Sequence, residues 1–249
     1  MKQLINTLQI LSGGDIQLEC GLRLSHPKLE DIKDVGEDVY NSFITTFCAD
    51  PYDLMIFLYK YEINYEDLNE FDLFNLLFSS FYYSEDTSFR YLVGKFFKLR
   101  GILRKTEFGN SFQYVDIITN KSIITPSNFH EIKLILREIT GYVKKPEETF
   151  VNKTTKEMYI LDIIETAEMD DKNGVRDENS ITLADLVGGV VLSTAYKYSE
   201  VWDLYLYQFH SCTRMLLRRE EYSHIMVGIY SGNIDAKKIS KDKIFWLHK

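Results

Sequence analysis

Apolar residues recur every three or four positions through most of the chain, and this spacing constrains the fold more than any other feature. A helix turns once every 3.6 residues, so the spacing gathers apolar side chains on one face. After His26-Pro27, the first such stripe runs along Leu29, Ile32, Val35, Val39, Phe43 and Phe47. Proline suits the first helical turn, because its missing N–H would be unbonded there in any case. The spacing therefore predicts a helix that opens at His26-Pro27.

Further helices follow from the same spacing and from residues that start or stop helices. Asp50-Pro51 begins a second stripe, and Thr125-Pro126 begins a helix that Gly141 ends. Thr182, with an acid three residues later, matches a capping box. The other predicted helices cover residues 71–83, 88–99 and 156–169. Near the end of the chain, a spacing of four and three predicts a seam of the coiled-coil type along Tyr198, Trp202, Tyr205, Phe209, Cys212 and Leu216.

Two shorter regions show the period of two that is typical of β-strands. In residues 4–24, β-type runs lie on both sides of Gly13-Gly14, which predicts an N-terminal β-hairpin with one buried face. In residues 112–124, alternation and a turn at Asn120-Lys121 predict a short central β pair. The sequence therefore predicts a helix-dominated α+β fold with several amphipathic helices. A linker-like composition divides the chain into an α+β domain at 1–143, a linker at 144–156 and a helical region at 157–249.

The composition is that of a globular protein. Of the 249 residues, 45% are hydrophobic and 27% are charged, which excludes wholesale disorder. The net charge of −8 argues against a dedicated binder of duplex nucleic acid. The sequence has neither a signal-type segment nor an apolar run long enough to span a bilayer, and its three cysteines are widely separated. We therefore expect a cytoplasmic protein with reduced thiols and no membrane contact.

No pattern of residues predicts catalytic chemistry or a bound cofactor. The acidic loop at 169–180 lacks the first and last carboxylates of a calcium loop, and the histidines and cysteines are too scattered for zinc. The order of Asp116, Glu131 and Lys133 is that of the aspartate, glutamate and lysine that hold magnesium in many nucleases. Glu131 and Lys133, however, fall in a helical pattern, where side chains two apart diverge. We predict no catalytic residue, no metal and no cofactor, and we expect that the protein is not an enzyme.

Charge is unevenly distributed along the chain. Residues 90–105 carry six basic residues and no acid, with aromatic residues between them, whereas residues 28–72 carry twelve acids and three bases. A basic segment with aromatic residues can follow phosphates and stack on bases. On a helix, however, its bases would form the solvated face, which favours a surface for acids of this chain or of a partner. Nucleic-acid binding stays an alternative.

Two stretches of the sequence are similar to one known group of proteins. The first covers residues 16–40, around His26-Pro27, and continues at 63–74; the second begins at Trp202 and runs through Arg218-Arg219-Glu220 to Ile244-Phe245-Trp246. Together they cover about half of the chain. This combination resembles proteins encoded in the tail modules of phages and prophages of low-GC Gram-positive bacteria. Those proteins are described as tail assembly chaperones or minor virion proteins.

The resemblance implies a non-enzymatic role in the cytoplasm of the bacterial host, where the protein would bind the tape-measure protein or tail-tube subunits during assembly. A permanent place in the virion, as a connector or baseplate protein, is the first alternative, and a nucleic-acid-binding or regulatory phage protein is the second. Self-association also stays open. We predict that partner binding involves Trp202, Tyr205, Phe209, Arg90, Lys98 and Arg100.

Overall fold

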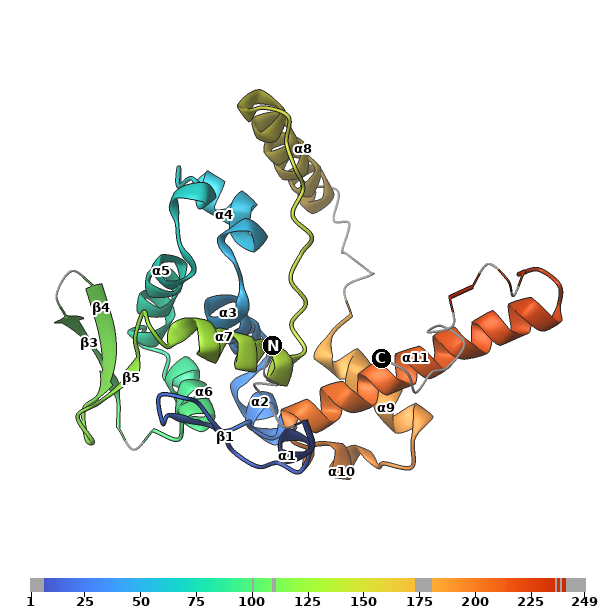
Figure 1. Cartoon of the computed structure of the whole chain (residues 1–249), viewed down its shortest axis with the longest axis horizontal. Helices are drawn as coiled ribbons and strands as arrows, with labels where there is room; N and C mark the ends of the chain where they lie inside the picture. Colours follow the sequence, from blue (N-terminus) through green and yellow to red (C-terminus); the bar gives the residue numbers. More distant parts are fainter. Residues whose placement is uncertain are drawn as a thin grey trace.

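The computed structural model describes residues 7–99, 101–108, 111–172, 181–235, 237, 239 and 240. Within these residues the chain forms eleven α-helices and two small antiparallel sheets (Figure 1). The predicted helix-dominated α+β fold is therefore confirmed.

The elements follow one another with short connections. The first helices are α1 (Thr7–Leu11), α2 (Leu29–Val35), α3 (Glu37–Cys48), α4 (Met55–Lys60), α5 (Glu70–Tyr82) and α6 (Ser88–Phe97). The later helices are α7 (Phe129–Thr140), α8 (Lys153–Lys172), α9 (Leu183–Ser193), α10 (Tyr198–Val201) and α11 (Leu206–Tyr230). Two short 3-10 helices are η1 (Pro51–Leu54) and η2 (Tyr65–Asp67). The strands are β1 (Ile16–Gln17), β2 (Arg23–Leu24), β3 (Leu103–Phe108), β4 (Ser111–Asp116) and β5 (Lys121–Ile124).

The helix predicted after His26-Pro27 is interrupted once. Gly36 has a φ of +90°, which residues with a side chain rarely adopt, and it separates α2 from α3. Its N–H closes α2 by donating to the carbonyl of Ile32. The apolar stripe nevertheless continues across the break, because Ile32, Phe43 and Phe47 are all fully buried.

The N-terminal β-hairpin is present, but its turn lies later than the sequence predicted. β1 pairs with β2 in antiparallel register, and the turn between them contains Gly21 at a φ of +84°. The β-type run predicted before Gly13-Gly14 is wrong. From residue 7 it forms α1, which docks through Ile10, while residues 4–6 lie outside the described part of the chain. Gly13-Gly14 therefore joins a helix to a strand.

The central sheet contains the predicted pair, β4 and β5, and one strand more. β3 pairs with the other edge of β4, so the order is β3-β4-β5. Tyr114 on β4 is fully buried, and its ring centroid lies 4.7 Å from that of Phe78 and 5.4 Å from that of Phe74. The sheet therefore packs one face against α5.

Phenylalanine side chains form most of the hydrophobic core. Phe43 and Phe47 on α3 lie at its centre, where Phe43 stacks on Phe96 of α6 with ring centroids 4.3 Å apart. Phe47 meets Phe74 of α5 at 5.3 Å, and Phe74 in turn meets Phe129 of α7 at 4.6 Å. Aromatic pairs of this kind add to the free energy gained by burial, so α3, α5, α6 and α7 form one tightly packed unit.

The seam predicted along Tyr198–Leu216 is not one continuous helix. α10 ends at Val201, and residues 202–205 are not helical before α11 begins. Backbone bonds to the start of α2 account for the break. The carbonyls of Trp202 and Leu204 accept the N–H groups of Glu30 and Leu29, each at 3.0 Å. The capping box of α9 is present, because Thr182 and Asp185 bond to each other's backbone N–H.

Residues 143–150 form neither helix nor strand and lead to α8, which packs mainly against α4 (Figure 1). The N–H of Lys145 donates to Asp53, and that of Glu148 donates to the hydroxyl of Tyr52 at 2.8 Å. The segment is therefore attached at two points to η1, which directly precedes α4. The division into a domain at 1–143, a linker and a region at 157–249 stays a prediction.

Candidate functional site

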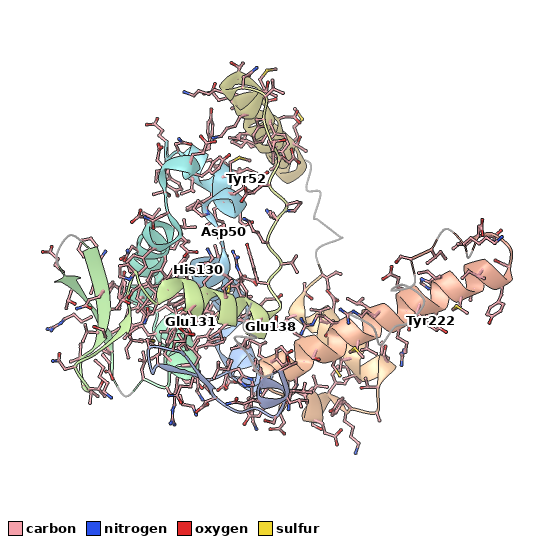
Figure 2. All side chains as sticks on the ribbon, in the orientation of Figure 1. Asp50, Tyr52, His130, Glu131, Glu138 and Tyr222 are labelled. Carbon is pink, nitrogen blue, oxygen red and sulfur yellow. The ribbon has the colours of Figure 1, made fainter. Side chains whose placement is uncertain are left out.

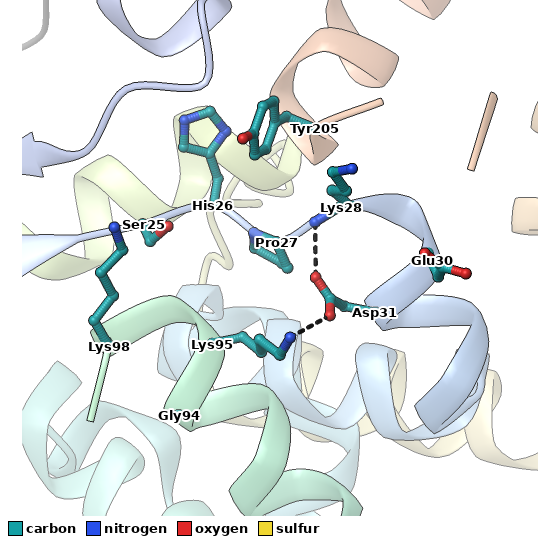
Figure 3. Close-up of a pocket in the computed structure, with 10 residues that line it drawn as sticks. All are labelled: Ser25, His26, Pro27, Lys28, Glu30, Asp31, Gly94, Lys95, Lys98 and Tyr205. Atoms are coloured by element: carbon teal, nitrogen blue, oxygen red, sulfur yellow. Dashed lines mark hydrogen bonds and ion pairs between the residues drawn. The ribbon is translucent and has the colours of Figure 1, made fainter. Parts of the chain in front are cut away.

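A hollow of about 450 Å³ lies where residues 25–31, the second half of α6 and Tyr205 meet (Figure 3). Backbone bonds fix this meeting point. The N–H of Ser25 donates to the carbonyl of Phe96 at 2.8 Å, and the N–H of Leu206 donates to the carbonyl of Pro27 at 2.9 Å. The hollow is thus built from three segments far apart in the sequence.

His26 forms one wall of the hollow and is only 1% exposed. Its Nε2 lies 3.2 Å from the carbonyl oxygen of Gly14, so we assign the proton to Nε2. Nδ1 then has a free lone pair and no hydrogen-bond partner among the described residues. Burial lowers the pKa of the imidazole, although the bond to Gly14 opposes this shift. The neutral imidazole is therefore buried with one acceptor that no described residue satisfies.

Tyr205 lies next to His26, with ring centroids 5.1 Å apart (Figure 3). Gly13 allows this arrangement, because a Cβ at that position would lie 2.2 Å from an edge atom of the Tyr205 ring. Tyr205 also pairs with Lys28 in an isolated antiparallel bridge. The ring therefore contacts His26 and lies close to Gly13, and the backbone of Tyr205 is fixed beside Lys28.

Three lysines surround the hollow, and each is paired with an aspartate. Nζ of Lys95 lies 2.7 Å from Asp31, Nζ of Lys98 lies 2.7 Å from Asp15, and Nζ of Lys28 lies 2.8 Å from Asp203. The hydrogen bond to Asp31 raises the pKa of Lys95. Burial opposes ionisation of Asp31, but the bonds from Lys95 and from the Lys28 N–H outweigh it and lower its pKa. Each lysine at the rim of the hollow is thus paired with an aspartate of the chain.

Lys98 carries a backbone conformation that is unusual for lysine. It caps α6 at a φ of +47°, where glycine is the favoured residue, and its N–H donates to the carbonyl of Gly94. A side chain in this region costs roughly 1–2 kcal/mol. Lys98 therefore places a cation at the hollow, although its backbone conformation makes the end of α6 less stable than glycine would.

The structure brings together two of the six predicted partner-binding residues, Lys98 and Tyr205. Trp202 lies close by, half-buried, with its carbonyl bonded to residue 30. Arg90 lies at the opposite end of α6 and donates to the carbonyl of Ser84, and Phe209 is fully buried in the core. Arg100 lies outside the described residues. Whether these side chains bind a partner stays a prediction.

Sequence reasoning missed His26, Asp31 and Lys95 as members of one site. Lys95 belongs to the basic segment, and its ion pair with Asp31 matches the expected contact between that segment and the chain's own acidic region. His26 stood beside Pro27 and was interpreted only as part of a helix start. Its contact with Tyr205 joins distant parts of the chain, so no local pattern could have revealed it.

A second polar cluster lies under α7. Lys133 is 1% exposed and forms an ion pair with Asp50, which Arg137 and Lys144 also contact at 3.0 and 3.2 Å. Burial alone would raise the pKa of Asp50, but the hydrogen bonds from Lys133 and Arg137 lower it to about 2. Figure 2 shows Asp50 beside α7. Because every member has a partner of opposite charge, the cluster fastens α7 to the start of η1.

The residues considered for metal binding do not come together. Glu131 accepts the N–H of Glu19, Lys133 faces Asp50, and Asp116 accepts a hydrogen bond from Thr119. Within the described ranges, no three histidine, cysteine or carboxylate side chains are grouped as metal ligands would be. The acidic loop at 169–180 lies largely outside those ranges.

Comparison with known proteins gives one match. Residues 172–249 match a family model described as the YomV second domain, a phage-associated family. The match spans just under a third of the chain and includes α9, α10 and α11, so Tyr205 belongs to it and His26 does not. No curated protein and no solved structure matches the chain significantly. Of the helices that the structure describes, none combines the length and the apolar character needed to cross a membrane.

Proposed function

We propose that this chain is a non-enzymatic phage protein that binds tape-measure or tail-tube proteins during tail assembly in the cytoplasm of the bacterial host. The phage-associated match of residues 172–249 supports the phage context. The resemblance of residues 16–40 and of the C-terminal stretch to tail-module proteins supports the role in assembly. A protein of this kind works through its surface.

The exposed apolar residues of α11 from Leu217 to Tyr230 carry the proposal. Leu217, Val227 and Tyr230 are 63%, 67% and 83% exposed. At 100° per residue they fall within less than half of the helix circumference, so they share one side of the helix. α11 has 25 residues and is therefore about 37 Å long, and its second half extends away from the other helices (Figure 1).

The same side of α11 also exposes Glu220, Ser223 and His224, so it mixes apolar and polar side chains. Protein–protein contact surfaces commonly have this mixed composition. A tape-measure protein is a long helical chain, and its apolar stripes are exposed before the tail polymerises around it. Such a stripe packs well against the exposed side of α11, because two helices bury their apolar ridges in each other's grooves. Leu192 on α9, which is 85% exposed, adds apolar area in the same matched segment.

The hollow adds polar contacts to this apolar surface. Lys98 can exchange Asp15 for a partner's carboxylate, because exposed ion pairs contribute only about 0–1 kcal/mol. Replacing one exposed ion pair by another changes the free energy of binding little. The contact therefore selects a partner with a matching carboxylate and still allows the partner to be released.

Co-expression with the neighbouring tape-measure gene tests the proposal. The chain should raise the soluble yield of the tape-measure protein, and the double variant Leu217→Glu/Val227→Glu should abolish most of that gain. The control is Ile102→Glu/Ile117→Glu, which places the same charges on side chains that are 50% and 54% exposed at the central sheet. No gain with the unchanged chain, or equal loss with both double variants, would count against the proposal.

Mass spectrometry of purified particles distinguishes an assembly protein from a virion component. An assembly protein should be absent or present only in traces. A stoichiometric amount would overturn the proposed role and support the connector or baseplate alternative.

A further inference from the structure

A second and larger hollow lies away from the first. It is a groove of about 1,430 Å³ between α4 and η2 on one side and residues 147–153 with α8 on the other. Figure 2 shows Tyr52 between α4 and the segment that leads to α8. Pockets for small molecules measure roughly 300–1,000 Å³, so this groove has room for a peptide segment.

The wall of the groove is apolar and aromatic. Met55 and Ile63 come from the α4 side, and Ile160 and Ile164 come from α8. Tyr52, Tyr59 and Tyr65 add ring surface on the α4 side. Tyrosine supplies contact area at a low cost in side-chain entropy, which suits a surface that binds a partner.

Carboxylates outnumber lysines around the groove by six to three. The carboxylates belong to Glu62, Glu66, Asp67, Glu147, Glu148 and Glu157. Lys156 of this chain shows how a cation binds at the groove. Nζ of Lys156 lies 3.0 Å from Glu66 and 4.0 Å from the centroid of the Tyr65 ring. At this groove a tyrosine face beside a carboxylate thus holds an ammonium group of the chain itself. Lysines of the chain also pair with Glu147 and Glu157, so an incoming cation exchanges with exposed lysines or pairs with Glu62.

Glu62 occupies a strained position at this groove. Its φ is +59°, and it follows α4 at the place where glycine usually ends a helix. The N–H of Ile63 donates to the carbonyl of Leu58, which closes the helix end around Glu62. Its carboxylate has no cationic partner among the residues that the structure describes. A glycine here would relieve the backbone but would remove a free negative charge from the groove.

We infer that this groove docks an amphipathic helix of another protein, with leucine-like side chains toward its apolar wall and lysine or arginine toward its carboxylates. The groove walls named here are helices and a segment without strand structure. A helix docking through its side chains suits them better than a strand pairing through its backbone. The inference concerns a surface separate from α11 and from the first hollow, so it does not depend on the role in tail assembly.

Three synthetic peptides of about 15 residues test the inference by fluorescence anisotropy with the full chain. The first has leucine and lysine in helical amphipathic order. The second has the same composition in scrambled order, and the third has glutamate in place of lysine. The first peptide should bind at least about tenfold more tightly than the other two. Equal binding of the scrambled or the acidic peptide, or no binding of the first, would overturn the inference.

Charge-reversal variants locate the binding. Glu62→Lys/Glu157→Lys should weaken binding of the first peptide about tenfold, whereas Glu85→Lys/Glu107→Lys, with the same change in net charge on exposed residues elsewhere, should change it less than twofold. Thermal melts check that all variants are folded, and Glu62→Gln/Glu157→Gln replaces the first pair if it does not fold. Equal weakening by both pairs would mean non-specific attraction and would overturn the inference. Neither result affects the co-expression test of the proposed function.

Discussion

Gly13 has no side chain, and this allows the N-terminal segment to pack against Tyr205 from the later part of the chain. A Cβ at Gly13 would overlap the ring of Tyr205, and the backbone there has a φ of +81°. Gly21 has nearly the same φ, +84°, but a Cβ there would meet no atom within 4 Å. Alanine at Gly21 should therefore cost backbone strain alone, whereas alanine at Gly13 should cost both backbone strain and a steric clash.

We predict that Gly13→Ala lowers the free energy of unfolding by about 3 kcal/mol, and Gly21→Ala by about 1 kcal/mol. The difference measures how firmly Tyr205 is held against the N-terminal segment. Urea unfolding followed by circular dichroism gives both values. Equal destabilisation by the two substitutions would show that Tyr205 moves aside freely.

The carboxylate of Asp50 gives a second prediction at the residue scale. Asp50→Asn leaves the buried ammonium of Lys133 with Glu70 alone, at 3.4 Å, so we expect a loss of about 3 kcal/mol at pH 7. Asp162→Asn on the exposed side of α8 is the control and should change stability by less than about 0.5 kcal/mol. Urea unfolding at pH 7 compares the two.

The effect of Asp50 should depend on pH in a defined window. Its pKa is about 2 in the folded chain and 3.8 for an ordinary aspartate, so folding favours the ionised form. Its contribution is therefore complete above about pH 4 and is lost as the pH falls toward 2. The difference in stability between the unchanged chain and Asp50→Asn should shrink over this interval. A difference that stays constant from pH 7 to pH 2.5 would contradict the assignment.

At the scale of elements, helices with an internal stripe and clear end signals could be predicted closely. The helix predicted at 71–83 is observed at Glu70–Tyr82, and Gly141 ends α7 at a φ of +69°. These elements were predictable because the residues that cap them and the residues that they bury are neighbours in the sequence. The same reasoning placed β4 and β5.

Elements decided by distant contacts could not be predicted. The apolar spacing from Tyr198 onward continues through residues 202–205, yet hydrogen bonds to the start of α2 break the helix there. β3 was missed because Arg104, Lys105 and Glu107 gave it a charged sequence. It is held as a strand by pairing with β4 and by bonds from its N–H groups to the hydroxyls of Tyr82 and Tyr83. The hollow could not be predicted for the same reason, since His26 contacts Tyr205 only after the chain has folded.

α8 is attached more weakly than the helices of the core. Among its described side chains, Ile160 alone is fully buried, whereas α7 buries seven residues. We predict that the amide hydrogens of residues 153–172 exchange with solvent much faster than those of residues 129–140, because α8 can open locally. Hydrogen exchange followed by mass spectrometry measures both. Similar protection of the two helices would contradict this prediction.

Two matched substitutions test the same difference. Ile160→Ala on α8 should lower the melting temperature little, since it releases only that helix. Ile135→Ala on α7 should cost about 2–5 kcal/mol of global stability. An equal loss from both would mean that α8 unfolds only together with the core.

At the scale of the whole molecule, one hydrophobic cluster spans the segment that matches the phage-associated family and the rest of the chain. Val190, Leu206 and Phe209 belong to the same buried cluster as Phe43 and Phe47. Contacts of α11 with α7 and α1 extend this connection. The physical continuity of the core argues that both parts unfold together.

We therefore predict a single cooperative unfolding transition. In a Trp246→Phe variant, Trp202 is the only tryptophan and reports on the contact between residues 202–205 and α2. Its fluorescence and the far-ultraviolet circular dichroism should change at the same urea concentration. An earlier change of the fluorescence would instead show that the C-terminal region separates first, as independent domains would.

Glu62 and Lys98 have opposite charges but share a left-handed backbone, and each lies at one of the two hollows. Glycine at either position would suit the helix end better. A library of this chain selected only for survival on heating should therefore accumulate glycine at both positions. A library selected for binding of a partner should retain the acid and the base, and the contrast between the two populations would show which of the two surfaces partner binding needs.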